Sequence, residues 1–164
     1  MISPRLAEVA AENWLKSQGY QTRRTVRTQW QMIDFFGADV IGKGKEDTVY
    51  IQVTVSQQSK HVMERRRKLE QIPWTETDYV CVFQYVERKS ISNPRRKERF
   101  FRSYVYDAYP DGERRWLSNS AINITPDMLK AHAHLPKEDS GAINSKKGMP
   151  SQLSPGSSGT NKGD

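Results

Sequence analysis

The sequence has little of what marks secreted, membrane-spanning or disulfide-stabilised proteins. It contains one cysteine, Cys81, in 164 residues, so no internal disulfide can form. No apolar run approaches the roughly 20 residues that a membrane-spanning helix needs, and the first residues, MISPRLAEVAAENW, include acidic side chains that secretory and transit signals lack. We therefore expect a cytoplasmic protein with no membrane partner. The apolar setting YVCVF predicts a buried, unreactive thiol at Cys81.

Positive charge is what the sequence has in excess. There are 26 Lys and Arg against 19 Asp and Glu, which gives a formal net charge of +7. Residues 57–102 hold twelve Lys or Arg against six Asp or Glu, in stretches that include MERRRKLE and ERKSISNPRRKERFFR. A polyanion such as nucleic acid is the partner that this charge favours, although a charge run can also be a solvated surface. Base-specific reading does not follow, because phosphate contacts position a protein without specifying sequence.

Hydrophobic periodicity predicts one α/β domain over residues 1–134, followed by a tail over residues 135–164. The predicted order is helix, three strands, helix, two strands and a short helix, over residues 3–18, 20–26, 32–41, 48–55, 59–71, 79–85, 99–106 and from 125 onward. The tail is rich in Ser, Gly, Pro, Asn and Lys. It has too few large apolar side chains to offset the entropy of ordering, so we expect it to be disordered.

Polar residues stand in the second and third predicted strands. Asp39 follows an apolar run in IDFFGADV, and Gln52 and Thr54 share one face of the strand over residues 48–55. The Asp39 carboxylate, the Gln52 amide oxygen and the Val53 carbonyl are hard oxygen donors of the kind that bind Mg²⁺. Glu8 on the first helix can add a carboxylate, with Glu12 one turn later as the reserve.

Two plainer interpretations of the same residues stand beside this one. Asp39 can simply end a strand before a glycine-rich turn. Gln52 and Thr54 can be solvent-facing residues of an amphipathic strand, since Thr is a good strand former on an exposed face.

These residues resemble the PD-(D/E)XK, or restriction-endonuclease-like, nuclease superfamily. Its pattern is a helix with Glu, a strand ending in Asp, a strand with an acid-x-Lys motif, then a helix and a strand. The first half looks most like archaeal-type Holliday-junction resolvases and Mrr-type nucleases, in which a helix Glu precedes a Gly-aromatic pair, here Glu8 before Gly19 and Tyr20. Asp39 matches the Asp of the motif, and Gln52 stands at the acid position, where Mrr-type enzymes also use Gln. The resemblance covers residues 3–83.

Thr54 departs from this pattern. The superfamily usually has Lys two residues beyond the acid, where it orients the attacking water and offsets charge on the phosphate. Threonine is neutral, so another cation must take this role if the chain is an enzyme. The nearest substitutes are Lys60 and His61 at the start of the following helix, or Lys43 and Lys45 in the preceding turn. A lysine from the next helix serves some members of the superfamily, and we expect Lys60.

The resemblance implies a restriction-endonuclease-like core with a mixed central sheet. It implies a Mg²⁺-dependent DNA endonuclease, with Mn²⁺ as a substitute, that acts as a homodimer. Branched or junction DNA is favoured over simple duplex as the substrate, in DNA recombination, and the small size suits a phage or mobile element. The alternatives are a nuclease-fold protein that has lost catalysis and binds DNA, and a basic adaptor for a protein partner.

The predicted site residues fall into three sets. The catalytic set is Glu8, Asp39, Gln52 and Lys60, and the metal ligands are Glu8, Asp39, Gln52 and Val53. The predicted DNA contacts are Arg5, Arg65, Arg66, Arg67 and Lys68.

Overall fold

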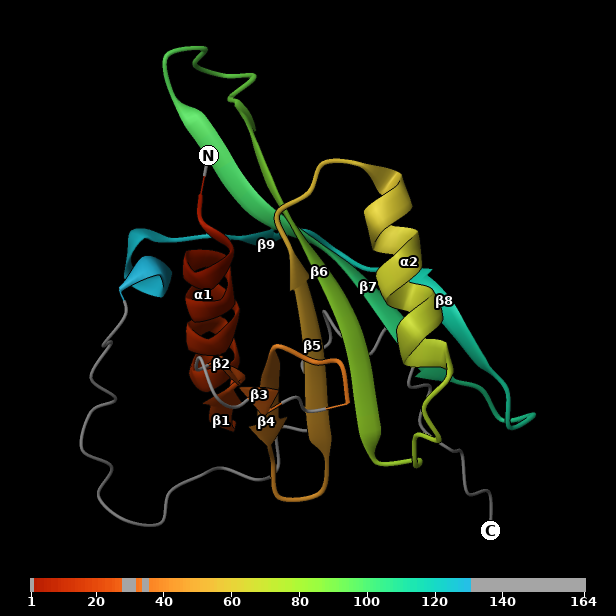
Figure 1. The fold of residues 1–164 in the computed structure, drawn as a ribbon. Coiled ribbons are helices and arrows are strands. Elements are labelled where there is room, and N and C mark those ends of the chain that lie inside the picture. Colours follow the sequence, from red (N-terminus) through yellow and green to blue (C-terminus); the bar gives the residue numbers. More distant parts are fainter. Residues whose placement is uncertain (1, 28–31, 34–35, 131–164) are drawn as a thin grey trace, which may run out of the picture.

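A computed structural model describes residues 2–27, 32–33 and 36–130 of the chain. It has a mixed α/β architecture, in which a curled mixed sheet is packed against two helices (Figure 1). The elements are α1 (Pro4–Ser17), β1 (Gln21–Arg24), β2 (Val26–Arg27), β3 (Met32–Ile33), β4 (Val40–Lys43), β5 (Thr48–Thr54), α2 (Ser59–Glu70), β6 (Asp78–Lys89), β7 (Lys97–Ala108), β8 (Arg114–Ser118), β9 (Ile122–Asn123) and the 3₁₀ helix η1 (Pro126–Leu129).

Seven of the described strands form the main sheet. Its order is β1-β4-β5-β6-β7-β8, and β9 pairs with the edge of β7 left free beside β8. Neighbouring strands are antiparallel except β5 and β6, which are parallel. A parallel pair needs a crossover connection, and α2 provides it. Strands β2 and β3 form a separate two-stranded sheet.

Helix α1 confirms the first predicted helix. The Ser3 side chain accepts a hydrogen bond from the Leu6 N–H at 3.2 Å, and Pro4 follows in the first turn. The helix ends before Gly19, whose φ of +93° is readily adopted by glycine. Gly42 on β4 lets the helix approach the sheet closely, since a Cβ at this position would overlap the Leu15 side chain.

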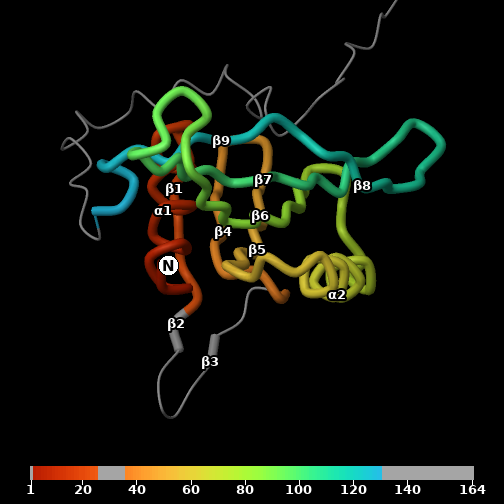
Figure 2. Tube along the Cα trace, turned by 90° about the horizontal axis from the view of Figure 1, so that it is seen from above, coloured from red at the N-terminus to blue at the C-terminus, as the bar shows by residue number. Residues whose placement is uncertain are grey.

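Two apolar clusters lie on opposite faces of the sheet, as the alternation of side chains along a strand requires. One cluster joins α1 to β4, β5, β6 and β7, and includes Leu15, Ile51 and Phe83. The other is built under α2 around Leu69 and Val82. The two views of the chain place α1 and α2 on either side of β5 (Figures 1 and 2).

The prediction of one strand over residues 32–41 is wrong. The structure has β3 and β4 instead, separated by a turn in which Phe36 and Gly37 have φ of 54° and 80°. Positive φ is incompatible with an extended strand, so the apolar run IDFFGADV is interrupted before Asp39. The predicted strand over residues 20–26 likewise divides, because Val26 belongs to β2, which pairs with β3.

The remaining predicted elements are confirmed, with some changes in length. β6 and β7 are each 12 residues long and form a hairpin that extends past the body of the sheet (Figure 1). We call its outer part, residues 87–99, the arm. Strands β8 and β9 were not predicted, and the short helix that begins after Thr125 is a 3₁₀ helix. The predicted tail over residues 135–164 lies outside the described residues.

Two further expectations concern burial and membranes. Cys81 lies on β6 with no exposed surface, and its burial raises the pKa of the thiol, which disfavours the reactive thiolate. This confirms the predicted buried thiol. None of the described helices is both long enough and apolar enough to span a membrane.

Candidate functional site

Asp39 is fixed in place by main-chain bonds on both sides. Its N–H donates to the Ile51 carbonyl on β5 at 2.9 Å, and its own carbonyl accepts from the Thr25 N–H at 2.8 Å. The residue is 4% exposed. Asp39 therefore lies just before β4, between the end of β1 and the middle of β5, where its side chain has a defined direction.

The Asp39 carboxylate accepts two hydrogen bonds from β5. Its Oδ2 atom lies 2.5 Å from Gln52 Nε2 and 2.8 Å from the Val53 backbone nitrogen. Hydrogen bonds to a buried carboxylate are charge-assisted, and they compensate in part for the loss of hydration. The structure thus brings Asp39, Gln52 and Val53 together, as the sequence predicted.

The orientation of the Gln52 amide follows from its partner. Nε2 donates to Asp39, so the amide positions the carboxylate, and the metal ligand predicted from the sequence is the other atom, Oε1. At Val53 it is the N–H that bonds to Asp39, whereas the carbonyl was the predicted ligand. Gln52 is buried rather than solvent-facing. The plainer interpretation of Gln52 and Thr54 as exposed strand residues is wrong for both.

Thr54 continues the buried polar face of β5. It is 3% exposed, and its hydroxyl accepts a hydrogen bond from the Ser56 N–H at 3.2 Å. The Ser56 hydroxyl lies 2.6 Å from Nδ1 of His61, in the first turn of α2. Gln84 on β6 pairs in register with Thr54 and donates to the Ser56 carbonyl at 2.9 Å. A connected polar network therefore joins the end of β5 to the start of α2.

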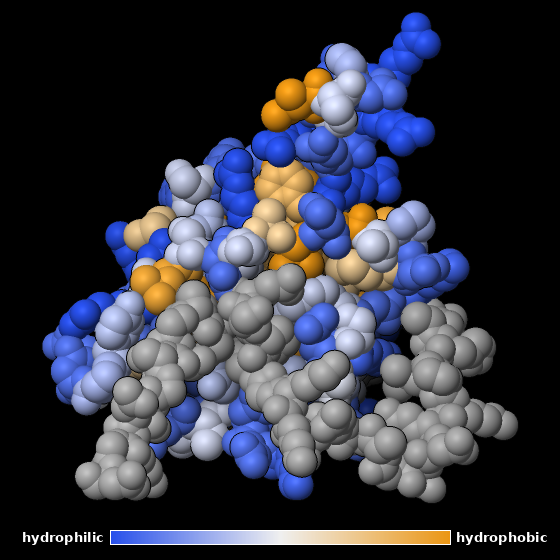
Figure 3. All heavy atoms as spheres, turned by 180° about the vertical axis from the view of Figure 1, so that it is seen from behind, coloured by the Kyte–Doolittle hydropathy of each residue, from blue (hydrophilic) through white to orange (hydrophobic). Residues whose placement is uncertain are grey.

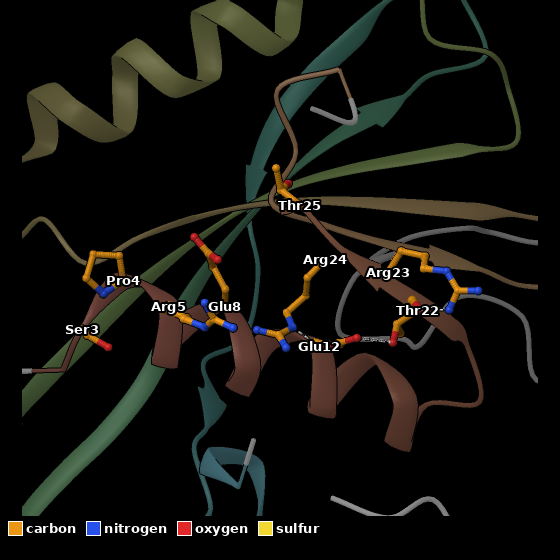
Figure 4. A pocket seen from close by; sticks show the side chains of 9 residues that line it. All are labelled: Ser3, Pro4, Arg5, Glu8, Glu12, Thr22, Arg23, Arg24 and Thr25. Carbon is orange, nitrogen blue, oxygen red and sulfur yellow. Dashed lines mark hydrogen bonds and ion pairs between the residues drawn. The ribbon is translucent and has the colours of Figure 1, made fainter. Parts of the chain in front are cut away.

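Glu8 lies in the wall of a pocket of about 540 Å³ between α1 and β1 (Figure 4). In this view its carboxylate points away from the helix, toward the side on which Thr25 lies. Thr25 is shared with the Asp39 segment, because its hydroxyl donates to the carbonyl of Ala38 at 2.8 Å. The pocket is lined by Ser3, Pro4, Arg5, Glu8, Glu12, Thr22, Arg23, Arg24 and Thr25.

Glu12, the alternative carboxylate on α1, is engaged in ion pairs and a hydrogen bond with neighbouring side chains. It forms an ion pair with Arg24 and accepts from the Thr22 hydroxyl at 2.9 Å (Figure 4). Its carboxylate also lies 3.6 Å from the Lys16 ammonium. These bonds tie α1 to β1. A carboxylate held by three such bonds is a poor candidate for a metal ligand, so Glu12 is not favoured as the alternative to Glu8.

Lys60 is placed at the start of α2, with its side chain 77% exposed and its ammonium 3.9 Å from Glu64. Among the described residues it has no hydrogen bond to Asp39 or Gln52. Its four-carbon side chain is flexible and held by one weak surface ion pair, so the role of Lys60 stays a prediction. His61 is instead turned toward Ser56 and β5.

The basic residues predicted to contact DNA differ in their surroundings. The Arg66 guanidinium lies 4.9 Å from the Trp116 ring and 5.7 Å from that of Tyr104, which packs α2 against β7 and β8.

Arg65 is half-buried, and Arg67 and Lys68 are exposed. Arg5 is exposed at the pocket. Arg5, Arg67 and Lys68 are thus accessible for a phosphate, whereas Arg66 also has a packing role.

The predicted metal ligands have the donor chemistry that a hard divalent cation prefers. Carboxylates at Glu8 and Asp39, an amide oxygen at Gln52 and a carbonyl at Val53 are all oxygen donors. Within the described ranges, no three His, Cys, Asp or Glu side chains cluster as a metal site. A site of this composition has only two carboxylates, so it relies on neutral oxygen donors for the rest of its coordination.

Sequence reasoning missed several residues of the site. Arg23, Arg24 and Thr25 line the pocket, and Thr25 also holds the main chain before β4. The segment QTRRT has no motif that would single these residues out. They belong to the site because β1 pairs with β4 and packs beside α1.

Comparison with protein-family models, curated proteins and solved structures finds no match to this chain.

Proposed function

We propose that the chain is a metal-dependent DNA endonuclease with a restriction-endonuclease-like core. The order of elements supports this: α1, the antiparallel strands β1, β4 and β5, the crossover helix α2 and the parallel strand β6 follow the pattern that the sequence resembles. We further propose a branched or junction DNA substrate and a homodimer that makes two symmetric cuts. These two points rest on the resemblance alone.

The observation that carries the proposal is the fixed Asp39 carboxylate. A buried carboxylate that is aimed by two N–H donors is costly to maintain, and such groups are concentrated at functional sites. It lies beside a pocket that holds Glu8 and three arginines. Acidic oxygen donors next to basic residues suit a phosphodiester, which needs a cation at the scissile phosphate and counter-charges for its neighbours.

Each group of the chain has a distinct part in this proposal. Asp39 and Glu8 would hold Mg²⁺ through their carboxylates, with the Gln52 Oε1 atom and the Val53 carbonyl as neutral ligands. When bound, Mg²⁺ lowers the pKa of a coordinated water and offsets charge on the phosphate oxygens. The Gln52 and Val53 N–H groups keep Asp39 in one orientation. Arg5 binds a neighbouring phosphate, and Lys60 offsets the charge that develops as the P–O bond breaks.

A second candidate function is DNA binding without cleavage. Thr54 favours it, because the buried hydroxyl cannot supply the positive charge that lysine provides at this position in the superfamily. The two candidates share the DNA-binding surface and differ only in chemistry.

A cleavage assay separates the two candidates. The purified chain is incubated with a four-way junction and with plasmid DNA in Mg²⁺ or Mn²⁺, alongside Asp39→Asn and the control Asp107→Asn. Asp107 is a half-buried carboxylate on β7, and β5 and β6 lie between β7 and β4, the strand that follows Asp39. We expect cleavage by the wild type and by the control, and none by Asp39→Asn. Tight, salt-sensitive binding without cleavage by the wild type would favour the binding protein, and no affinity even at low salt would favour the adaptor.

A further inference from the structure

The arm projects from the body of the domain as a two-stranded ribbon. β5 pairs with β6 only as far as Gln84, and β9 pairs with β7 only at Phe100 and Phe101. Residues 87–89 therefore pair only with residues 97–99. On the outer side of this pairing, the Arg99 carbonyl also accepts from the Ile124 N–H at 2.9 Å, so the ribbon leaves the body of the domain at Arg99. Figure 1 shows this hairpin extending beyond the other elements.

The end of the arm is ordered by its own hydrogen bonds. The Ser90 N–H donates to the Arg96 carbonyl at 2.8 Å, and the Arg96 N–H donates to the Asn93 carbonyl at 2.9 Å. The Asn93 side chain accepts from the Arg95 N–H at 3.1 Å. The tip is thus preformed, which lowers the entropy that binding a partner would cost.

Positive charge is concentrated at this tip. Residues 88–97 contain five Lys or Arg and no Asp or Glu. The acidic residues at the base, Glu87 and Glu98, pair with Lys97, Arg99 and Arg88. The side chains of Lys89, Arg95 and Arg96 make no hydrogen bond or ion pair with any described residue.

One cross-strand pair in the arm is unfavourable in the isolated chain. Lys89 stands directly opposite Lys97 in the register of β6 and β7. Like charges in such positions destabilise a hairpin. The ion pair of Lys97 with Glu87, at 2.7 Å, offsets part of this repulsion, and a polyanion bound along the ribbon would offset more of it.

The chemistry of the tip favours phosphates over a lipid surface. Ile91, which is 86% exposed, is the large apolar side chain of the tip, and the other side chains there are polar or charged. Figure 3 shows the projection as mostly hydrophilic, with a small hydrophobic patch near its end. A membrane-inserting hairpin needs more apolar area than this. A two-stranded ribbon also has the width that the major groove of DNA admits.

We propose that the arm is a second DNA-contacting element, which lies along duplex DNA and binds backbone phosphates through Lys89, Arg95 and Arg96. The choice of DNA as the polyanion rests on the proposed function. The arm extends the contact beyond the pocket at α1, so it contributes affinity and orientation without touching the cleaved bond.

Binding to a short labelled DNA duplex in EDTA tests the arm separately from cleavage. Arg95→Ala/Arg96→Ala is compared with the control Arg115→Ala/Lys130→Ala, which removes the same charge from exposed residues elsewhere. Each lost phosphate contact lowers the slope of log Kd against log salt by about 0.9. We expect the arm variant to bind more weakly with a slope lower by about 2, and the control to resemble the wild type.

Three results would overturn the proposal. The first is that the wild type binds and the arm variant has the same affinity and slope as the control. The second is that the wild type does not bind duplex DNA at low salt. The third is that the arm drives binding to phosphatidylserine vesicles but not to DNA. If the wild type binds DNA through the arm but does not cleave it, the proposed nuclease function is contradicted and the arm proposal is still supported.

Discussion

The side chains of Asp39 and Gln52 are joined by a hydrogen bond in the protein interior, with 2.5 Å between Oδ2 and Nε2. An amide donor can lie against a carboxylate without a cation between them. A second carboxylate at the Gln52 position would repel Asp39 unless a cation bridged the two. The glutamine therefore stabilises the site in the absence of metal, and it lowers the charge available to bind one.

Gln52→Glu should make the stability of the protein depend on a divalent cation. Two carboxylates at this distance raise the pKa of one of them, so the folded state binds a proton more tightly than the unfolded state. The variant should lose about 1–3 kcal/mol at pH 7, and the loss should shrink as the pH falls toward 5. Mn²⁺ or Mg²⁺ should raise its Tm more than that of the wild type, measured by thermal unfolding.

Gln84→Glu is the matched control for this measurement. Gln84 is also a buried glutamine on the same face of the sheet, but its amide bonds to the Ser56 carbonyl rather than to a carboxylate. The Gln84→Glu variant should have a lower Tm than the wild type, and Mn²⁺ or Mg²⁺ should not restore it. If the cation raises the Tm of both variants equally, or of neither, the hypothesis of a metal site at Asp39 is contradicted.

Lys60→Ala should reduce cleavage by about 10²–10³ with little change in the Kd for DNA, because the proposed role of Lys60 is to offset charge in the transition state. Lys43→Ala is the control, since Lys43 is exposed at the end of β4, where it lies 3.4 Å from the Thr48 hydroxyl. Single-turnover cleavage rates are the measurement. If His61→Ala carries the large loss instead, the residue that faces Ser56 replaces Lys60 in the mechanism.

Glu87 should make the base of the arm sensitive to acid. The hydrogen bond from Lys97, with further bonds from Tyr85 and Arg99, lowers the pKa of Glu87 from 4.5 to about 2. Its stabilising contribution is therefore complete above pH 4.5 and is lost as the pH falls toward 2. Glu87→Gln should cost about 1 kcal/mol or less at pH 7, because solvent screens the pair.

The difference between Glu87→Gln and the wild type should shrink below pH 4.5 and be lost as the pH falls through 2 in chemical denaturation experiments. Glu76→Gln, at an exposed carboxylate outside the arm, should show little difference at either pH. A constant difference across the whole range would show that Glu87 acts through packing rather than through its charge.

Periodicity was a good guide to the elements that pack locally. The Ser3 cap and the spacing of apolar residues predicted α1, and clean alternation predicted β5. Periodicity did not predict the places where the backbone conformation interrupts an apolar run. At Phe36 and Gly37 the chain turns with positive φ, and hydrophobic content alone does not record this.

The sequence by itself determined which chemical groups are present: Glu8, Asp39, Gln52, the absence of a lysine at position 54, and the excess of positive charge. It also determined the spacing of apolar residues that is typical of helices and of strands. Only the tertiary structure decided that Gln52 donates to Asp39 and that Glu12 forms an ion pair with Arg24. It also decided that three cations at the end of a ribbon have no ion pair within the described part of the chain. The physical reason is that these are contacts across strand registers and helix faces, which depend on distance in space and leave no pattern along the chain.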